Sequence, residues 1–279
     1  MPVKFGFVLP VTDPKVAIEL SAEAEAAGWD GVFVAEMIYG PDAWVILTGA
    51  AMRTERIRLG TLLSPVARMR PWKIASETAT LDRISDGRVI LAVGLGALET
   101  GYKEYGEVTD RKTRVELTEE TLQIVTLLWK GEPFNFQGKH YQVDITGLSQ
   151  GIRDWETRPV QQPRIPIWHA GTWPAGPSMR RALKYDGLLP NVFLDGKHAS
   201  STPEAIAEMR ALANETRGVD VPYDIIVEGE SQPNNPEEIE KMNAWEQAGA
   251  TWWIESSWSK QDDIDFLRAR ISGGPPRGA

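Results

Sequence analysis

The chain has 279 residues, enough for one large domain or two of ordinary size, with 42% hydrophobic and 25% charged residues, as in globular proteins. The absence of cysteine excludes disulfides, thiolate zinc sites, iron–sulfur clusters and cysteine nucleophiles. The 39 acidic and 30 basic residues give a net charge of −9, which argues against a nucleic-acid partner.

The N-terminal stretch MPVKFGFVLP lacks the length and the cleavage site of a signal peptide. No apolar stretch approaches the roughly 20 residues that span a bilayer. We therefore expect a cytoplasmic protein without a membrane partner.

Eight short runs are apolar throughout, which is typical of strands that are covered on both faces. In chain order these predicted strands are Val3–Leu9, Gly31–Ala35, Ile57–Leu62, Val89–Val93, Ile165–Ala170, Gly187–Pro190, Tyr223–Val227 and Thr251–Glu255. Amphipathic segments with proline in the first turn, polar caps or a closing glycine lie between them. The predicted helices are Pro14–Ala27, Pro41–Met52, Pro71–Ile84 and Lys112–Lys130, with two more beginning at Pro203 and Pro236.

Eight β/α alternations predict an α/β fold, a (β/α)8 TIM barrel in a single domain over residues 1–279. The alternative is an open doubly wound sheet, whose nucleotide-binding form carries a glycine fingerprint after its first strand. Here the first strand is followed by Pro10, Val11 and Thr12 instead. The segment 131–164, rich in Gly, Gln, Pro and aromatic residues, interrupts the alternation. We predict that it is an insertion between the fourth helix and the fifth strand that folds over the barrel mouth.

In such barrels the active site lies at the C-terminal ends of the strands, so polar residues there are candidates. Glu36 follows the second strand and His169 ends the fifth, and each has a structural alternative as a hydrogen-bonded side chain of the barrel. Glu228, Glu230 and Glu255 end the last two strands and their roles stay open. They lack a histidine cluster and a local ligand spacing, so no metal site is predicted.

The stretch from Gly171 to Ser178 joins the fifth strand to a helix. Glycine and hydroxyl residues before a helix N-terminus favour a phosphate cradle, because free backbone N–H groups point outward there. An ordinary capped loop is the alternative.

A set of motifs resembles the luciferase-like flavin-dependent oxidoreductases, the family of bacterial luciferase. The motifs are AEAAGWDGVFVAE (24–36), TERIRLGT (54–61), ATLDRISDGR (79–88), LLWKGEP (127–133), QPRIPIW (162–168) and YDG (185–187). The resemblance implies a (β/α)8 barrel that holds FMN or the deazaflavin coenzyme F420 at its mouth. It also implies a cis non-proline peptide at Leu62–Leu63. The residues it places at the cofactor are Glu36, Met37, Thr61, Leu62, Leu63, Ser64, Gly94, Leu95, Gly96, Ala170, Gly171, Thr172 and Ser178.

Two positions depart from bacterial luciferase. Met37 and Ile38 stand where its catalytic histidine follows strand two, and Leu95 stands where its phosphate-binding arginine follows strand four. His169, with Glu36, is therefore the candidate for the catalytic acid/base. Four tryptophans, at 44, 72, 168 and 173, are candidates to wall an apolar substrate pocket, with core packing as the alternative.

The resemblance implies an enzyme, a monooxygenase that uses reduced FMN on a small organic substrate, as a homodimer and with a separate flavin reductase as a possible partner. One alternative is F420-dependent hydride transfer, which a basic rim from Arg68, Arg70 and Lys197 would favour. A non-catalytic flavin-binding protein is a second alternative, and an unrelated barrel hydrolase or lyase is a third.

Overall fold

Eight parallel strands form a closed barrel in the computed structural model, which describes residues 2–10, 13–148, 158–174, 176–194, 197–233 and 235–277. In barrel order they are β1 (Lys4–Leu9), β2 (Gly31–Val34), β3 (Arg58–Thr61), β4 (Val89–Val93), β7 (Ile167–Trp173), β8 (Gly187–Leu194), β10 (Asp224–Gly229) and β11 (Trp252–Glu255). The ring closes because β10 pairs with β8 and β11 pairs with β1. Each predicted strand overlaps one of these, so the predicted (β/α)8 barrel is confirmed.

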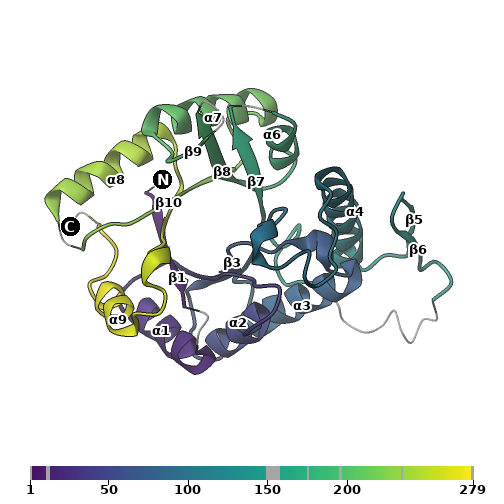
Figure 1. Ribbon diagram of the computed structural model, residues 1–279, viewed down its shortest axis with the longest axis horizontal. Helices are drawn as coiled ribbons and strands as arrows, with labels where there is room; N and C mark the ends of the chain where they lie inside the picture. The colour runs from purple at the N-terminus through teal and green to yellow at the C-terminus, as the bar shows by residue number, and fades with distance from the viewer. Residues whose placement is uncertain are drawn as a thin grey trace.

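Helices surround the strands, as the view down the barrel shows (Figure 1). They are α1 (Pro14–Ala26), α2 (Ala43–Ala51), α3 (Pro71–Ile84), α4 (Arg111–Lys130), α6 (Pro177–Ala182), α7 (Pro203–Arg217), α8 (Pro236–Ala248) and α9 (Ile264–Ser272). Short 3-10 turns η1 (Val66–Arg68), η2 (Leu98–Thr100) and η3 (Trp258–Lys260) follow β3, β4 and β11. Side chains such as Asp13, Asp110 and Thr202 accept backbone N–H groups at helix starts. None of the described helices has the length and hydropathy to cross a membrane.

The barrel interior is filled by its own apolar cluster, separate from the layer between strands and helices. Phe33 stacks on Trp168 at a centroid distance of 5.4 Å, and Trp252 meets both rings edge-on. Trp168 is fully buried and its indole N–H donates to Asp224. Leu63 and Ala170 pack on top of this cluster and are only partly buried. The interior is therefore a sealed core, and any cavity must lie above it.

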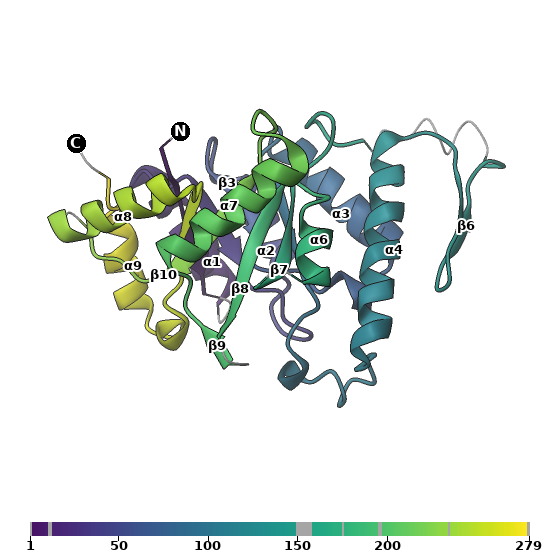
Figure 2. The same cartoon turned by 90° about the horizontal axis from the view of Figure 1, so that it is seen from above.

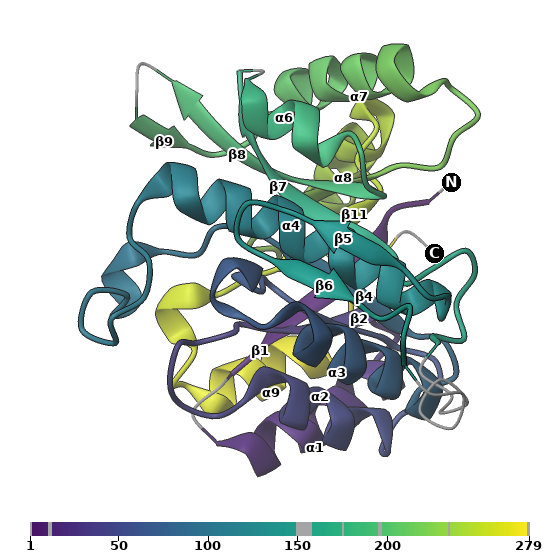
Figure 3. The ribbon, with the colours of Figure 1, turned by 90° about the vertical axis from the view of Figure 1, so that its right-hand side faces the viewer.

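The insertion lies where it was expected along the chain, between α4 and β7, and contains the hairpin β5 (Asn135–Gln137) and β6 (Gln142–Asp144). The hairpin lies on the outer side of α4, beyond the ring of helices (Figures 1 and 2). Figure 3 shows it crossing the face of α4. The reason is Glu120, whose carboxylate accepts the backbone N–H groups of Lys139, His140 and Tyr141 at 2.8–3.0 Å.

The C-terminal end of the insertion is bound to α3 near the start of β4, where the N–H groups of Val160 and Gln161 donate to Asp82. For residues 131–148 and 158–164 the predicted position over the mouth is therefore wrong. The rest of the insertion lies outside the described residues.

Candidate active site

A cavity of about 840 Å³ opens at the C-terminal ends of β2, β3, β4, β7 and β8. This volume is typical of a site for a cofactor or small ligand. The sequence-predicted residues that line it are Glu36, Met37, Leu62, Leu63, Gly94, Leu95, Gly96, His169, Ala170, Gly171, Thr172 and Ser178. The structure thus brings nearly all predicted site residues to one place.

Thr61 and Ser64 lie behind the cavity wall, each fully buried. Their hydroxyls share a hydrogen bond of 2.8 Å, and Ser64 also donates to the carboxylate of Glu36. An Arg68 nitrogen lies 3.8 Å from the same carboxylate. Burial nevertheless raises the pKa of Glu36. The two hydroxyl residues therefore act on the site through Glu36.

The floor of the cavity is apolar and is formed by Leu62, Leu63, Gly94 and Ala170. Leu62 and Leu63 are joined by a cis peptide bond, as the resemblance implied. A Cβ atom added to Gly94 would lie 2.8 Å from a Leu63 methyl carbon and 3.3 Å from the Ala170 Cβ, so glycine lets these side chains meet in one surface. Such a shelf suits a planar ring system.

His169 forms part of one wall and is 4% exposed. Its Nδ1 lies 2.8 Å from the carbonyl of Ala170, and its ring stacks on Tyr185 at 5.8 Å. Burial lowers the pKa of His169 to about 4, so the imidazole is neutral near pH 7. Because a carbonyl only accepts, Nδ1 carries the proton and Nε2 is an acceptor.

Arginines line the cavity at positions that sequence reasoning mostly missed. Arg111 and Arg114 come from the first turns of α4, and Arg181 comes from α6. Arg68 was predicted as part of a basic rim and does line the cavity, whereas Arg70 and Lys197 are not among its lining residues. The signal for Arg114 was available, since it continues the buried stripe of α4 through Leu122, Val125 and Trp129.

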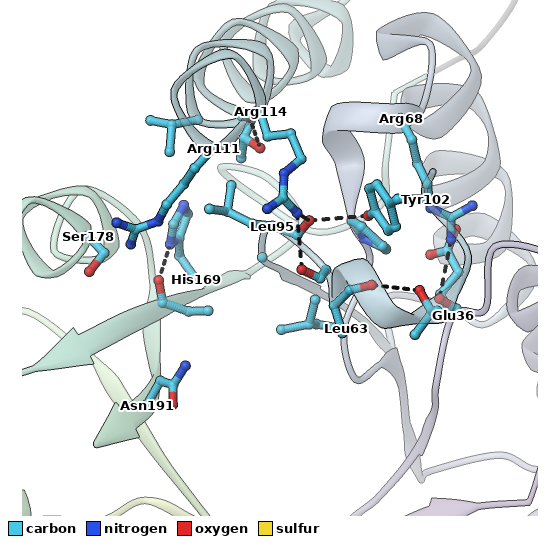
Figure 4. Close-up of a pocket in the computed structure, with 18 of the residues that line it drawn as sticks. Glu36, Leu63, Arg68, Leu95, Tyr102, Arg111, Arg114, His169, Ser178 and Asn191 are labelled. Atoms are coloured by element: carbon cyan, nitrogen blue, oxygen red, sulfur yellow. Dashed lines mark hydrogen bonds and ion pairs between the residues drawn. The ribbon is translucent and has the colours of Figure 1, made fainter. Parts of the chain in front are cut away.

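Figure 4 shows Glu36 and Arg68 at one end of the cavity. Arg111, His169 and Ser178 lie together at the other end. The Thr172 N–H in β7 donates to the Ser178 hydroxyl in α6 at 2.9 Å, and both residues line the cavity at this end. The cavity therefore runs from Glu36 and Arg68 at one end to Arg111, His169 and Ser178 at the other.

Several polar atoms in the wall are buried without a hydrogen-bond partner. They are Nε of Arg68, Nε of Arg114 and Oδ1 of Asn191. Buried polar atoms in folded proteins are almost always paired, so these atoms indicate a ligand with matching polar groups.

The remaining predicted candidates lie elsewhere. Glu255 is buried in an ion pair with Arg270 at 3.0 Å, which is a structural contact away from the cavity. The four tryptophans proposed as a pocket wall do not line this cavity: Trp44 and Trp168 are buried in the core, and Trp72 is half exposed. Among the described residues no cluster of histidine and carboxylate side chains is arranged to hold a metal ion.

Comparisons with known proteins identify the family of the chain. A family model described as luciferase-like monooxygenase matches residues 4–262. A putative coenzyme F420-dependent oxidoreductase of Mycobacterium tuberculosis is 32% identical over 181 residues, 63% of this chain and 51% of its own length. The F420-dependent glucose-6-phosphate dehydrogenase of Microbacterium testaceum is 28% identical over 284 residues, covering 96% of this chain and 80% of its own. The chain thus spans about half the length of the first of these relatives.

Solved structures share the fold. An F420-dependent secondary alcohol dehydrogenase, in complex with an F420–acetone adduct, has a TM-score of 0.72 at 18% identity and covers 99% of this chain and 100% of its own. The oxygenating constituent of 3,6-diketocamphane monooxygenase from Pseudomonas putida, in complex with FMN, has a TM-score of 0.74 at 16% identity and covers 98% and 97%. The chain therefore belongs to the luciferase-like monooxygenase family of (β/α)8-barrel oxidoreductases.

Proposed function

We propose that this chain is an F420-dependent oxidoreductase that transfers a hydride between the deazaflavin and a small organic substrate. The observation that carries the proposal is the group of Arg111, Arg114 and Arg181 in the cavity wall of a chain whose net charge is −9. A local cationic lining in an acidic protein favours a polyanionic ligand. F420 has a phosphate and an oligoglutamate tail, and the curated relatives described above are F420-dependent by name.

The residues present fit this cofactor in three respects. The shelf of Leu63, Gly94 and Ala170 suits the planar ring. Ser178 and Arg181 of α6 suit the phosphate, since hydroxyl and guanidinium groups both bind phosphate oxygens. The unpartnered nitrogens of Arg68 and Arg114 supply further donors. When bound, F420 supplies two-electron hydride chemistry.

The two residues predicted as catalytic, His169 and Glu36, would position the cofactor at the two ends of the cavity. His169, neutral and with Nε2 as an acceptor, would bind a cofactor hydroxyl, and it is a poor proton donor near pH 7 because its pKa is lowered to about 4. Glu36, held by Ser64 and Arg68, would orient the ring edge at the opposite end.

A reduced-FMN monooxygenase is the second candidate. Ser178 and Arg181 would also suit the single terminal phosphate of FMN. In that case a separate reductase would supply the reduced flavin.

Anaerobic titration of the apoprotein with F420, FMN and riboflavin, followed by cofactor fluorescence, tests the proposal. We expect F420 to bind more tightly than FMN, and both to bind more tightly than riboflavin, which lacks the phosphate. Arg181→Met should weaken F420 binding by about tenfold, the typical value of a charge-assisted hydrogen bond. Arg180→Met is the matched control, because Arg180 is exposed and is not among the lining residues.

Three results would change the proposed activity. Selective binding of FMN, with reduced FMN consumed faster in air than without protein, would replace F420 transfer with oxygen chemistry. Binding without turnover under any reductant would favour a flavin-binding protein. Binding of neither cofactor would refute the proposal.

A further inference from the structure

One end of the cavity continues into an apolar rim that the contacts proposed for the cofactor phosphate do not use. Met37 and Ile38, in the loop after β2, line the cavity there, and Tyr102 lines it from the segment after η2. Arg68 fixes the first loop by donating to the carbonyls of Glu36 and Met37 at 3.2 and 2.8 Å. Figure 4 shows Tyr102 at the same end as Glu36 and Arg68. Both segments therefore lie at this end of the cavity.

We call these two segments the rim loops, residues 37–42 and 97–108. They contact each other through Tyr39 and Tyr105, whose ring centroids lie 6.2 Å apart. A Cβ atom added to Gly101 would lie 3.2 Å from the Tyr105 ring and 3.7 Å from the Ile38 Cγ2, so the backbone of the second loop lies against the side chain of the first. The two tyrosines thus join the loops beside Ile38, which is a cavity residue.

Much of the apolar surface of the rim loops is open to solvent. Tyr39 and Tyr105 are 79% and 57% exposed, and Met37 is also exposed. An exposed apolar patch that continues into a cavity is typical of a ligand-binding surface, because a ligand that covers it removes apolar area from water. Arg111 and Ser178, which suit the cofactor phosphate, lie at the opposite end (Figure 4). The rim is therefore left for the substrate.

Two aromatic side chains in the cavity wall favour a flat ring as the apolar part of that substrate. Tyr102 is held by its hydroxyl, which donates to the Leu95 carbonyl at 3.2 Å. Phe193 lines the cavity from β8, and His198 of the short strand β9 (Lys197–Ala199) meets its ring edge-on. Aromatic rings attract one another beyond the area that they bury, so these two side chains favour an aromatic ligand.

The charges around the rim favour an uncharged ligand. The rim loops carry four acidic residues and one lysine, namely Asp42, Glu99, Glu104, Glu107 and Lys103. This excess of negative charge repels an anionic substrate. A cationic substrate would find no free carboxylate in the described cavity wall, where Glu36 is the sole acidic residue and is already bound by Ser64 and Arg68.

We propose that the rim loops bind the substrate of this enzyme, that the substrate is an uncharged aromatic compound, and that Met37 and Ile38 contact it directly. Tyr39 and Tyr105 are positioning residues, since they act by holding the two loops together beside Ile38. The inference rests on the proposed function, because the cofactor occupies the shelf and the cationic end and leaves the rim to the substrate.

Binding of small probes to the F420-loaded protein tests the substrate class. Benzamide carries an uncharged aromatic ring, benzoate is an anion of nearly the same shape, and acetamide lacks the ring. We expect saturation-transfer NMR titrations to give benzamide a Kd about tenfold lower than that of either comparison compound. Equal or tighter binding of benzoate would overturn the uncharged class, and equal binding of acetamide would overturn the aromatic class.

Ile38→Ala tests the direct contact. We expect the Kd for benzamide to increase about tenfold, because the variant removes apolar atoms that the probe buries, while the Kd for F420 stays within about twofold of native. Val219→Ala is the matched control, since Val219 is an exposed aliphatic residue that is not among the lining residues. It should bind benzamide as the native protein does. An unchanged Kd for benzamide in Ile38→Ala would overturn the contact.

Tyr39→Ala, Tyr105→Ala and the double variant test the positioning role. Each single variant should raise the Kd for benzamide about threefold, the value of one aromatic pair. The double variant should raise it no further, because the loss of one ring already breaks the pair. Tyr105→Phe keeps the ring and should keep native binding. Native affinity in both single variants, or additive effects in the double variant, would overturn the role of the pair.

These results separate the inference from the proposed function. Binding of F420 without a preference for benzamide would overturn the inference and leave the proposed function standing. Failure to bind F420 would refute the proposed function. In that case benzamide titrations of the apoprotein and of Ile38→Ala would still support or overturn the rim as an aromatic-binding surface.

Discussion

His169 shows how burial of one ionisable side chain couples the site to pH. Its pKa is about 4 in the folded protein, against 6.5 for an ordinary histidine. Between these values the unfolded chain binds a proton that the folded protein excludes, so stability increases with pH across this window. The benefit of excluding that proton is complete above pH 6.5 and is lost as the pH falls towards 4.

We predict that His169 accounts for a decrease of about 3 kcal/mol in the free energy of unfolding between pH 6.5 and pH 4, since one pKa unit corresponds to about 1.4 kcal/mol. Urea denaturation of the native protein and of His169→Gln at several pH values gives the free energy of unfolding. The native protein should show the steeper dependence of this free energy on pH. His198→Gln, which changes an exposed histidine, should keep the native slope. Parallel curves for native protein and His169→Gln would show that burial does not hold this histidine neutral.

The backbone shape of the β4–η2 loop depends on one glycine. Gly96 has φ +74°, and an added Cβ would lie 2.3 Å from the Tyr102 hydroxyl and 2.8 Å from the Pro65 Cβ. The carbonyls of Leu95 and Gly96 accept hydrogen bonds from Arg114 at 2.9 and 3.2 Å. A shift of this loop would therefore also move an arginine of the cavity wall.

We predict that Gly96→Ala lowers the free energy of unfolding by more than about 2 kcal/mol, the sum of φ strain and overpacking, and weakens cofactor binding. Gly106→Ala is a matched control, since Gly106 has φ +72° and open space around it. It should cost only the strain, about 1 kcal/mol. Urea denaturation and cofactor fluorescence measure both effects. Equal costs for the two substitutions would mean that the loop relaxes around the added methyl group.

The sequence predicts elements well where they build the core and poorly where they do not. The eight barrel strands are short apolar runs, which an enclosed parallel strand requires. The strands β5, β6 and β9 have three residues each and carry mainly polar side chains. Their pairing depends on tertiary partners such as Glu120, which no local pattern reveals.

The cavity belongs to the whole molecule, because its walls come from residues 35 to 193. The rule that barrel sites lie at strand ends, together with the family resemblance, was enough to predict most residues that follow β2, β3, β4 and β7. It could not predict Arg111 or Arg181, because they reach the cavity from helices whose rotation is decided by packing. Thr61 and Ser64, which were also predicted at the cofactor, are fully buried behind the wall, and Ser64 donates to the cavity residue Glu36.

Closure of the ring depends on joining the last β/α unit to the first. Helix α9 packs against α1, and the indole N–H of Trp29 donates to the carbonyl of Ile271 at 3.0 Å. Arg270 lies at this junction, 7% exposed, and binds the carboxylate of Glu255 and both the carbonyl and the hydroxyl of Ser231. One guanidinium thus connects α9, β11 and the segment that follows β10.

We predict that Arg270→Ala lowers the free energy of unfolding by about 3–5 kcal/mol, because it leaves the 1% exposed Glu255 buried without a cation. Arg268→Ala is the matched control on the same helix: its ion pair with Glu23 is solvent-exposed, so the change should cost less than about 1 kcal/mol. Urea denaturation of both variants measures the difference. Similar small losses in the two variants would mean that Ser231 compensates the Glu255 carboxylate without Arg270, and that ring closure relies on the apolar packing of α9.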